Sequence, residues 1–174
     1  MHDGFYLRMD LGLVLASTHV TANDVAHPSY SVGGAGLGLD ALIGGTPSVG
    51  LTIGGALSFQ GFGHSNGSSA NLGMLGVFVD GFPTPNKGLH FGGLLGLASN
   101  RTQRPNNVDE FRGRGLGLAA WTGYDWWVAD EWSMGGMLRF SGALTRDKPR
   151  GSADGVEFKG SSYELAFLFT VLYH

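Results

Sequence analysis

The sequence contains no cysteine, which excludes both a disulfide framework and thiol chemistry. Charged residues are also scarce, since they make up 14% of the chain, against roughly 25% in an ordinary soluble domain. No apolar run reaches the roughly 18 to 20 residues that a membrane-spanning helix needs, because Gly, Ser, Asp or Arg interrupts every candidate. If the chain crosses a membrane, it must do so with the strands of a closed barrel, which pair every backbone N–H and C=O without water.

The chain also lacks the patterns that mark export, cofactor binding or nucleic-acid binding. No positively charged segment with an apolar core precedes the first strand pattern, so we expect a mature form with an added start methionine. The formal net charge of −3 argues against nucleic acid as a partner. Glycines 115 and 117 belong to an alternating strand pattern and not to a phosphate-binding turn. We therefore expect no cofactor and no metal site in what the length predicts to be one domain, residues 1–174.

Glycine is the strongest compositional bias that is present, at 31 of 174 residues. It follows no three-residue period, which excludes a collagen triple helix. Helix is a poor setting for so much glycine, at roughly 1 kcal/mol per residue relative to alanine. In residues 33–39 glycine alternates with larger residues, which favours a strand over a flexible linker.

Eight segments place a large apolar residue at every second position, with small or polar residues between. These segments are 5–16, 32–43, 49–60, 71–82, 89–99, 115–128, 132–145 and 161–173. The fourth fits either phase; with Leu75, Val77 and Val79 pointing outward, Asp80 points inward. Soluble strands average about 5 to 6 residues, whereas a tilted strand needs about 9 to 11 to cross a bilayer. The segment lengths therefore favour a membrane.

The connections between these segments alternate in length. Those at 44–48, 83–88 and 129–131 are short, and those at 17–31, 61–70, 100–114 and 146–160 are long. Outer-membrane barrels have this asymmetry, with short periplasmic turns and long extracellular loops. The sequence predicts an all-β chain: a single eight-stranded antiparallel up-and-down transmembrane β-barrel with both termini on the periplasmic rim.

Aromatic residues gather near the predicted short-turn rim, as interfacial rings do in membrane barrels. A soluble barrel with these rings in its core is the alternative, but it would leave few charges and many glycines to cover its surface. We therefore predict an aromatic girdle made of Phe5, Phe82, Trp126, Trp127, Trp132 and Tyr173.

The chain resembles the small eight-stranded outer-membrane barrels, on the opening segment 4–12, the segment 123–127 and the closing strand from Tyr163. That group includes the outer membrane protein A transmembrane domains, the W-type and X-type proteins and the opacity-type adhesins. The resemblance implies an integral protein of the bacterial outer membrane. Such proteins commonly end in an aromatic residue; here Tyr173 is penultimate and His174 is last.

The predicted inner face carries a set of ionisable residues. Charges in so narrow a lumen must be paired or hydrated. Arg139 and Glu164 could face each other across a hairpin, and Arg8 lies at a depth similar to that of several aspartates. We favour a structural network that plugs the lumen, and keep a polar path for a small solute and a catalytic or metal role as alternatives. The network comprises Arg8, Asp10, Asp40, Asp80, His90, Asp125, Arg139 and Glu164.

Most basic residues fall in the predicted outer loops. The phosphates of lipopolysaccharide are the partner that such residues suggest, while ordinary solvated loops with acids nearby are an equal alternative. The residues are Arg101, Arg104, Arg112, Arg114, Arg146, Lys148, Arg150 and Lys159.

Three functions remain open. The first is a noncatalytic outer-membrane barrel, monomeric, that anchors surface loops contacting lipids or a protein partner. The second is a narrow pore or a conduit for hydrophobic small molecules. The third is a lipid-modifying enzyme. Its candidate residues are His64 beside Ser65, His19 and His27, although spacing ties no carboxylate to them.

Overall fold

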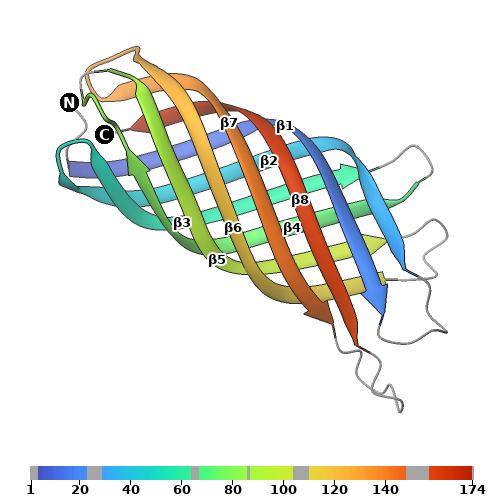
Figure 1. Ribbon diagram of the computed structural model, residues 1–174. Helices are drawn as coiled ribbons and strands as arrows, with labels where there is room; N and C mark the ends of the chain where they lie inside the picture. Colours follow the sequence, from blue (N-terminus) through green and yellow to red (C-terminus); the bar gives the residue numbers. More distant parts are fainter. Residues whose placement is uncertain are drawn as a thin grey trace.

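The structure is a computed structural model that describes residues 4–22, 29–63, 67–85, 87–103, 110–147 and 157–173. These residues form eight strands that pair antiparallel in chain order, and β1 also pairs with β8 to close a barrel (Figure 1). The predicted fold class is confirmed. The strands are β1 Gly4–Ala22, β2 Tyr30–Ser48, β3 Leu51–Gly63, β4 Ser69–Gly81, β5 Leu89–Gln103, β6 Glu110–Trp127, β7 Trp132–Asp147 and β8 Phe158–Tyr173.

Within the described residues, no helix is long and apolar enough to cross a membrane.

The large apolar residues of the alternating pattern face outward in all eight strands, and the residues between them face the lumen. Leu13 and Phe167, partners on β1 and β8, are 69% and 72% exposed. In β4 Leu75 and Val77 are exposed while Asp80 is fully buried, so the fourth segment takes the predicted phase. The barrel is therefore apolar on its outside and mixed on its inside, the reverse of a soluble barrel.

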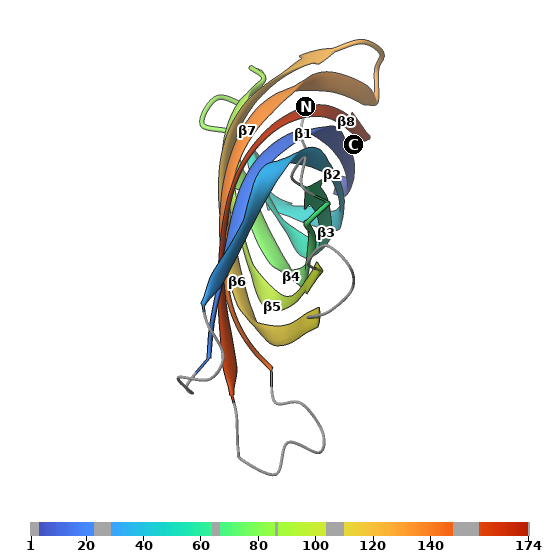
Figure 2. The same cartoon turned by 90° about the vertical axis from the view of Figure 1, so that its right-hand side faces the viewer.

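The strands are strongly staggered, which sets the width of the lumen. Following register partners from Thr18 on β1 through β8, β7 and the remaining strands leads back to β1 at Arg8. Closing a barrel with such a stagger requires strands tilted by roughly 35–45° from its axis. The oblique course of the strands is visible in Figures 1 and 2. An eight-stranded barrel of this kind leaves an interior just wide enough for side chains to fill.

The strand ends differ from the prediction at the rim opposite the termini. β1 continues to Ala22, β5 to Gln103, and β6 begins at Glu110, so strand residues occupy much of the predicted long loops. The physical reason is that apolar alternation ends where lipid ends, whereas backbone pairing continues through polar residues. The strict alternation of long and short connections is also wrong, since segment 82–88 is longer than segment 64–68.

One short turn also lies elsewhere than predicted. The segment 44–48 belongs to β2, which runs to Ser48 through a register irregularity, and the chain reverses at Val49 and Gly50. Gly50 has a φ of +77°, a conformation that L side chains rarely adopt. Its carbonyl accepts the N–H of Phe82 at 2.7 Å, which ties this turn to the neighbouring connection.

Glycine permits a close approach of two strands at Gly76 on β4 and Gly96 on β5. The two are register partners, and a Cβ on Gly96 would lie 2.7 Å from the Cα of Gly76. A Cβ on Gly76 would lie 2.5 Å from the Cα of Gly96. The neighbouring atoms are backbone and cannot give way without deforming the strands.

We expect Gly96→Ala to lower the free energy of unfolding by an amount near the upper end of the roughly 1–3 kcal/mol that overpacking costs. The control is Gly136→Ala on β7, where an added Cβ meets no atom within 4 Å. Urea unfolding of the barrel refolded into phospholipid vesicles measures both. Equal unfolding midpoints for the two variants would show that the close approach does not constrain the fold.

Candidate functional site

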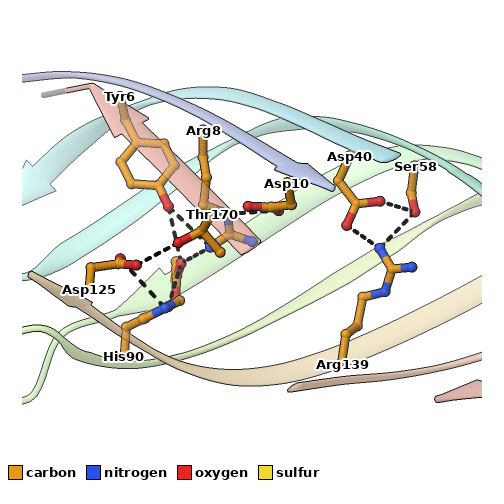
Figure 3. A network of polar contacts seen from close by, with 10 residues as sticks. Tyr6, Arg8, Asp10, Asp40, Ser58, His90, Asp125, Arg139 and Thr170 are labelled. Atoms are coloured by element: carbon orange, nitrogen blue, oxygen red, sulfur yellow. Dashed lines mark hydrogen bonds and ion pairs between the residues drawn. The ribbon is translucent and has the colours of Figure 1, made fainter. Parts of the chain in front are cut away.

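The eight ionisable residues assigned to the lumen all lie on inward-facing strand positions and are buried. Successive side chains of a strand point to opposite faces of the sheet, so a residue next to an outward-facing residue points into the lumen. They form two groups of contacts, which we name after their arginines the Arg8 network and the Arg139 network (Figure 3). The residues are Arg8, Asp10, Asp40, Asp80, His90, Asp125, Arg139 and Glu164.

The Arg8 network lies towards the rim that carries the termini. Arg8 Nε donates to Asp10 Oδ2 at 3.1 Å, and Arg8 Nη1 donates to Asp80 Oδ2 at 2.6 Å. The Tyr6 hydroxyl donates to the same Asp80 oxygen at 3.1 Å and accepts a hydrogen bond from Arg8 Nη1 at 3.2 Å. The guanidinium also lies over the Trp121 ring, 4.9 Å from its centroid. Two carboxylates, a phenol and an indole thus surround this buried cation.

His90 extends the Arg8 network across the lumen to β6 and β8. Its Nδ1 lies 3.1 Å from Asp80 Oδ1, and its Nε2 lies 3.6 Å from Asp125 Oδ2. The Thr170 hydroxyl donates to Asp125 Oδ1 at 2.7 Å. The network therefore joins β1, β4, β5, β6 and β8, so that its side chains bridge opposite walls of the barrel (Figure 3).

The Arg139 network occupies the middle of the barrel. Arg139 forms an ion pair with Asp40 through Nη1 and with Glu164 through Nη2, the latter at 2.5 Å. Nη1 also donates to the Ser58 hydroxyl at 3.0 Å, and Ser58 donates to Asp40 Oδ1 at 2.6 Å. Gln60 contacts Ser58 and completes a group that spans β2, β3, β7 and β8.

The strand register explains which acidic residues each arginine contacts. Glu164 is the partner of Ser141 and so lies diagonally from Arg139. Asp10 and Asp40 are direct partners on β1 and β2, yet Asp10 contacts Arg8 while Asp40 contacts Arg139. The two facing carboxylates are thus neutralised by different cations, Asp10 by Arg8 and Asp40 by Arg139.

Several participants in these networks carry no charge and were missed in the sequence. They share the inward phase of the charged residues, and this phase was the signal that could have identified them. Neutral polar side chains supply the remaining hydrogen bonds, as buried charges require. They are Tyr6, Ser58, Gln60 and Thr170.

Phe82, predicted in the aromatic girdle, is instead buried inside the barrel. Its ring stacks on His90 with the centroids 5.3 Å apart. Phe82 follows Asp80 by two residues, so alternation puts both on the inner face. It therefore covers the Arg8 network from the rim that carries the termini.

The other predicted girdle residues lie at the rim that carries the termini. Tyr173 meets Phe5 and Trp132 in edge-to-face contacts, with ring centroids 6.2 and 5.1 Å apart. Its hydroxyl donates to Glu131 at 2.8 Å. Trp126 is exposed and Trp127 is half-buried. Three of these rings thus pack in a row across β7, β8 and β1, beside the seam where the barrel closes.

Apolar side chains fill the lumen around and between the two networks. A cavity of about 10 Å³ is lined by both arginines, Asp40, Trp121 and apolar neighbours. A volume near 10–15 Å³ holds about one water molecule. Further toward the opposite rim, Asn100 donates to Ser162 at 2.7 Å.

The described basic residues of the outer rim lie on strands and not in loops. Each is exposed and points away from the lumen: Arg101 on β5, Arg112 and Arg114 on β6, Arg146 on β7 and Lys159 on β8. Arg104, Lys148 and Arg150 lie outside the described residues.

Of the three histidines considered as catalytic candidates, His19 lies within the described residues and the other two do not. His19 Nδ1 lies 2.7 Å from the Ser31 hydroxyl on the outer face of β1 and β2. No carboxylate of the described residues forms an ion pair with His19. His27, His64 and Ser65 lie outside the described residues. In the part of the chain that the structure describes, no three His, Asp or Glu residues are arranged to hold a metal ion.

No family model and no curated protein sequence matches the chain. Among solved structures it is similar to Neisserial surface protein A, with 17% identity and a TM-score of 0.54 over 98% of this chain and 96% of that chain. It is also similar to the outer membrane protein OprG from Pseudomonas aeruginosa, with 10% identity and a TM-score of 0.53 over 99% of this chain and 98% of that chain. The chain has the fold of the small eight-stranded outer-membrane barrels.

Its apolar outer face suits contact with lipid, as in the outer-membrane barrels whose fold it shares. Barrels of this class place both termini and the short turns on the periplasmic side. By this comparison, the rim with Phe5, Trp132 and Tyr173 corresponds to their periplasmic rim, and the rim with the basic residues corresponds to their extracellular rim.

Proposed function

We propose that this outer-membrane barrel is noncatalytic, that its lumen is closed, and that it anchors its outer connections at the cell surface. The observation that carries the proposal is the filled lumen. Two ion-pair networks and the apolar side chains around them bridge opposite walls, and the cavity beside the arginines measures about 10 Å³. A polar path for a solute needs a continuous hydrated route, which such a cavity does not supply.

The noncatalytic part of the proposal is supported by the outer histidine. His19 contacts Ser31 but forms no ion pair with a described carboxylate that could orient the imidazole. A serine nucleophile usually needs a base that a third group holds in place.

Conductance in planar lipid bilayers tests the closed lumen. We expect the barrel to produce no channel events above the lipid background at moderate voltage, because side chains of both networks bridge the lumen. Discrete conductance steps from the unmodified protein would contradict the proposal and favour the alternative of a narrow pore.

A matched pair of variants shows that the assay detects an open lumen. Phe82→Ala combined with Trp121→Ala removes two inward rings, and we expect it to produce conductance steps. Phe140→Ala combined with Leu118→Ala removes similar apolar volume from the outer face and should stay silent. Heat-modifiable migration on a gel confirms that each variant is folded before recording.

A further inference from the structure

The outer face of β6 and β7 carries a groove with a volume of about 850 Å³, within the range typical of ligand sites. Its floor lies at Gly142, whose register partners are Leu118 on β6 and Tyr163 on β8. The lack of a side chain at Gly142 leaves a depression between these two exposed residues. Leu116, Phe140 and Leu144 add to the apolar lining.

The extracellular end of this groove is cationic. Arg114, Arg146 and Lys159 are successive register partners on β6, β7 and β8, and all three line the groove. Arg114 and Arg146 lie one outward-facing position nearer the rim than Leu116 and Leu144, so positive charge begins where the apolar face ends. Glu157 forms an ion pair with Arg146 at 3.7 Å, but that guanidinium is still 71% exposed.

On the described part of this rim, the exposed positive charge lies on one side of the barrel. The sequence from residue 29 to residue 85 contains no lysine or arginine, so β2, β3 and β4 carry none. The exposed basic residues of the described extracellular rim all lie on β5 to β8. A one-sided row of cations at the end of an apolar groove is complementary to an amphiphile with an anionic head.

We infer that this groove binds one molecule of lipid A, the phosphorylated and multiply acylated anchor of lipopolysaccharide in the outer leaflet. Its phosphate accepts hydrogen bonds from Arg114, Arg146 and Lys159, and an acyl chain lies over Gly142. Guanidinium groups suit this role, because their planar donors match phosphate oxygens. The inference depends on the extracellular position of the rim and not on the closed lumen, so the conductance results leave it unaffected.

Native mass spectrometry of the full chain, refolded in detergent, tests this inference. The probes are bisphosphorylated lipid A, the same lipid without phosphates, phosphatidylglycerol and inorganic phosphate. We expect one bisphosphorylated lipid A to stay bound at concentrations where the other three probes are lost. Equal retention of phosphatidylglycerol would overturn the inference in favour of a general anionic surface, and equal retention of dephosphorylated lipid A would overturn the role of the phosphate.

Two variants separate the head of the groove from its floor. Each basic residue that contacts the anionic head group contributes roughly fivefold in affinity, so Arg114→Gln, Arg146→Gln and Lys159→Gln together should weaken binding about 100-fold. Gly142→Leu fills the floor without changing charge, and the nearest atom to its added Cβ lies 3.6 Å away. We expect it to weaken binding at least tenfold.

Arg101→Gln is the matched control, because Arg101 belongs to the same rim but does not line the groove. It should change affinity less than twofold. A loss with Arg101→Gln equal to that of the triple variant, or undiminished binding by Gly142→Leu, would overturn the assignment of this groove. Heat-modifiable migration confirms folding, and Gly142→Leu keeps the test decisive if the triple variant does not fold.

Discussion

Replacing Arg139 by methionine should lower the free energy of unfolding by about 3–5 kcal/mol, the cost of breaking a buried ion pair by removing one partner. Methionine keeps much of the side-chain volume but leaves Asp40 and Glu164 buried without their cation. Ser58 loses its bond from the guanidinium as well. Urea unfolding in phospholipid vesicles, followed by tryptophan fluorescence, measures the loss.

The matched control is Arg101→Met, which removes an exposed arginine from the rim and should cost no more than about 1 kcal/mol. A second comparison combines Arg139→Met with Asp40→Asn and Glu164→Gln. This triple variant should recover most of the stability, because no uncompensated charge stays in the Arg139 network. If Arg139→Met and Arg101→Met unfold at the same urea concentration, the Arg139 network does not stabilise the barrel.

The sequence predicted the architecture because lipid imposes a period of two on every strand. Even the fourth segment, where Leu75 and Val77 fitted two phases, took the phase that buried Asp80. Beyond the lipid-facing part of the strands, the predicted strand ends were wrong. β1 continues through Thr18 to Ala22, where backbone pairing goes on and polar side chains such as Thr18 and His19 contact neighbouring strands.

Alternation also predicted which ionisable side chains enter the lumen, but not how they pair. Pairing depends on the stagger of the strands, which determines that Asp40 meets Arg139 and not Arg8. The outer groove was beyond sequence reasoning for the same reason. Arg114, Arg146 and Lys159 are far apart in the chain, and only register aligns them across three strands.

An arginine in place of Leu13 should cost about 2–4 kcal/mol when the barrel is embedded in a bilayer, as expected for a lipid-facing charge near the midplane. Leu13 is 69% exposed and lies beside Leu37 and Phe167, which are also exposed and apolar. The comparison is Ser17→Arg, on the same face of β1 and four residues nearer the basic rim, with an expected cost of about 0–1 kcal/mol. Urea unfolding in phospholipid vesicles measures both variants.

The difference between these variants reflects depth together with the loss of the Leu13 side chain, because both add the same charged side chain to the same face of one strand. Arginine at position 17 can reach the headgroups, where water and phosphate solvate its charge. At position 13 its nearest neighbours are hydrocarbon, and the side chain must bend towards the rim or draw water into the bilayer. Unfolding in detergent micelles should shrink the difference, because a micelle deforms around a charge more easily than a bilayer. A similar cost at both positions in vesicles would mean that the apolar exterior between Leu13 and Ser17 does not mark the edge of the membrane.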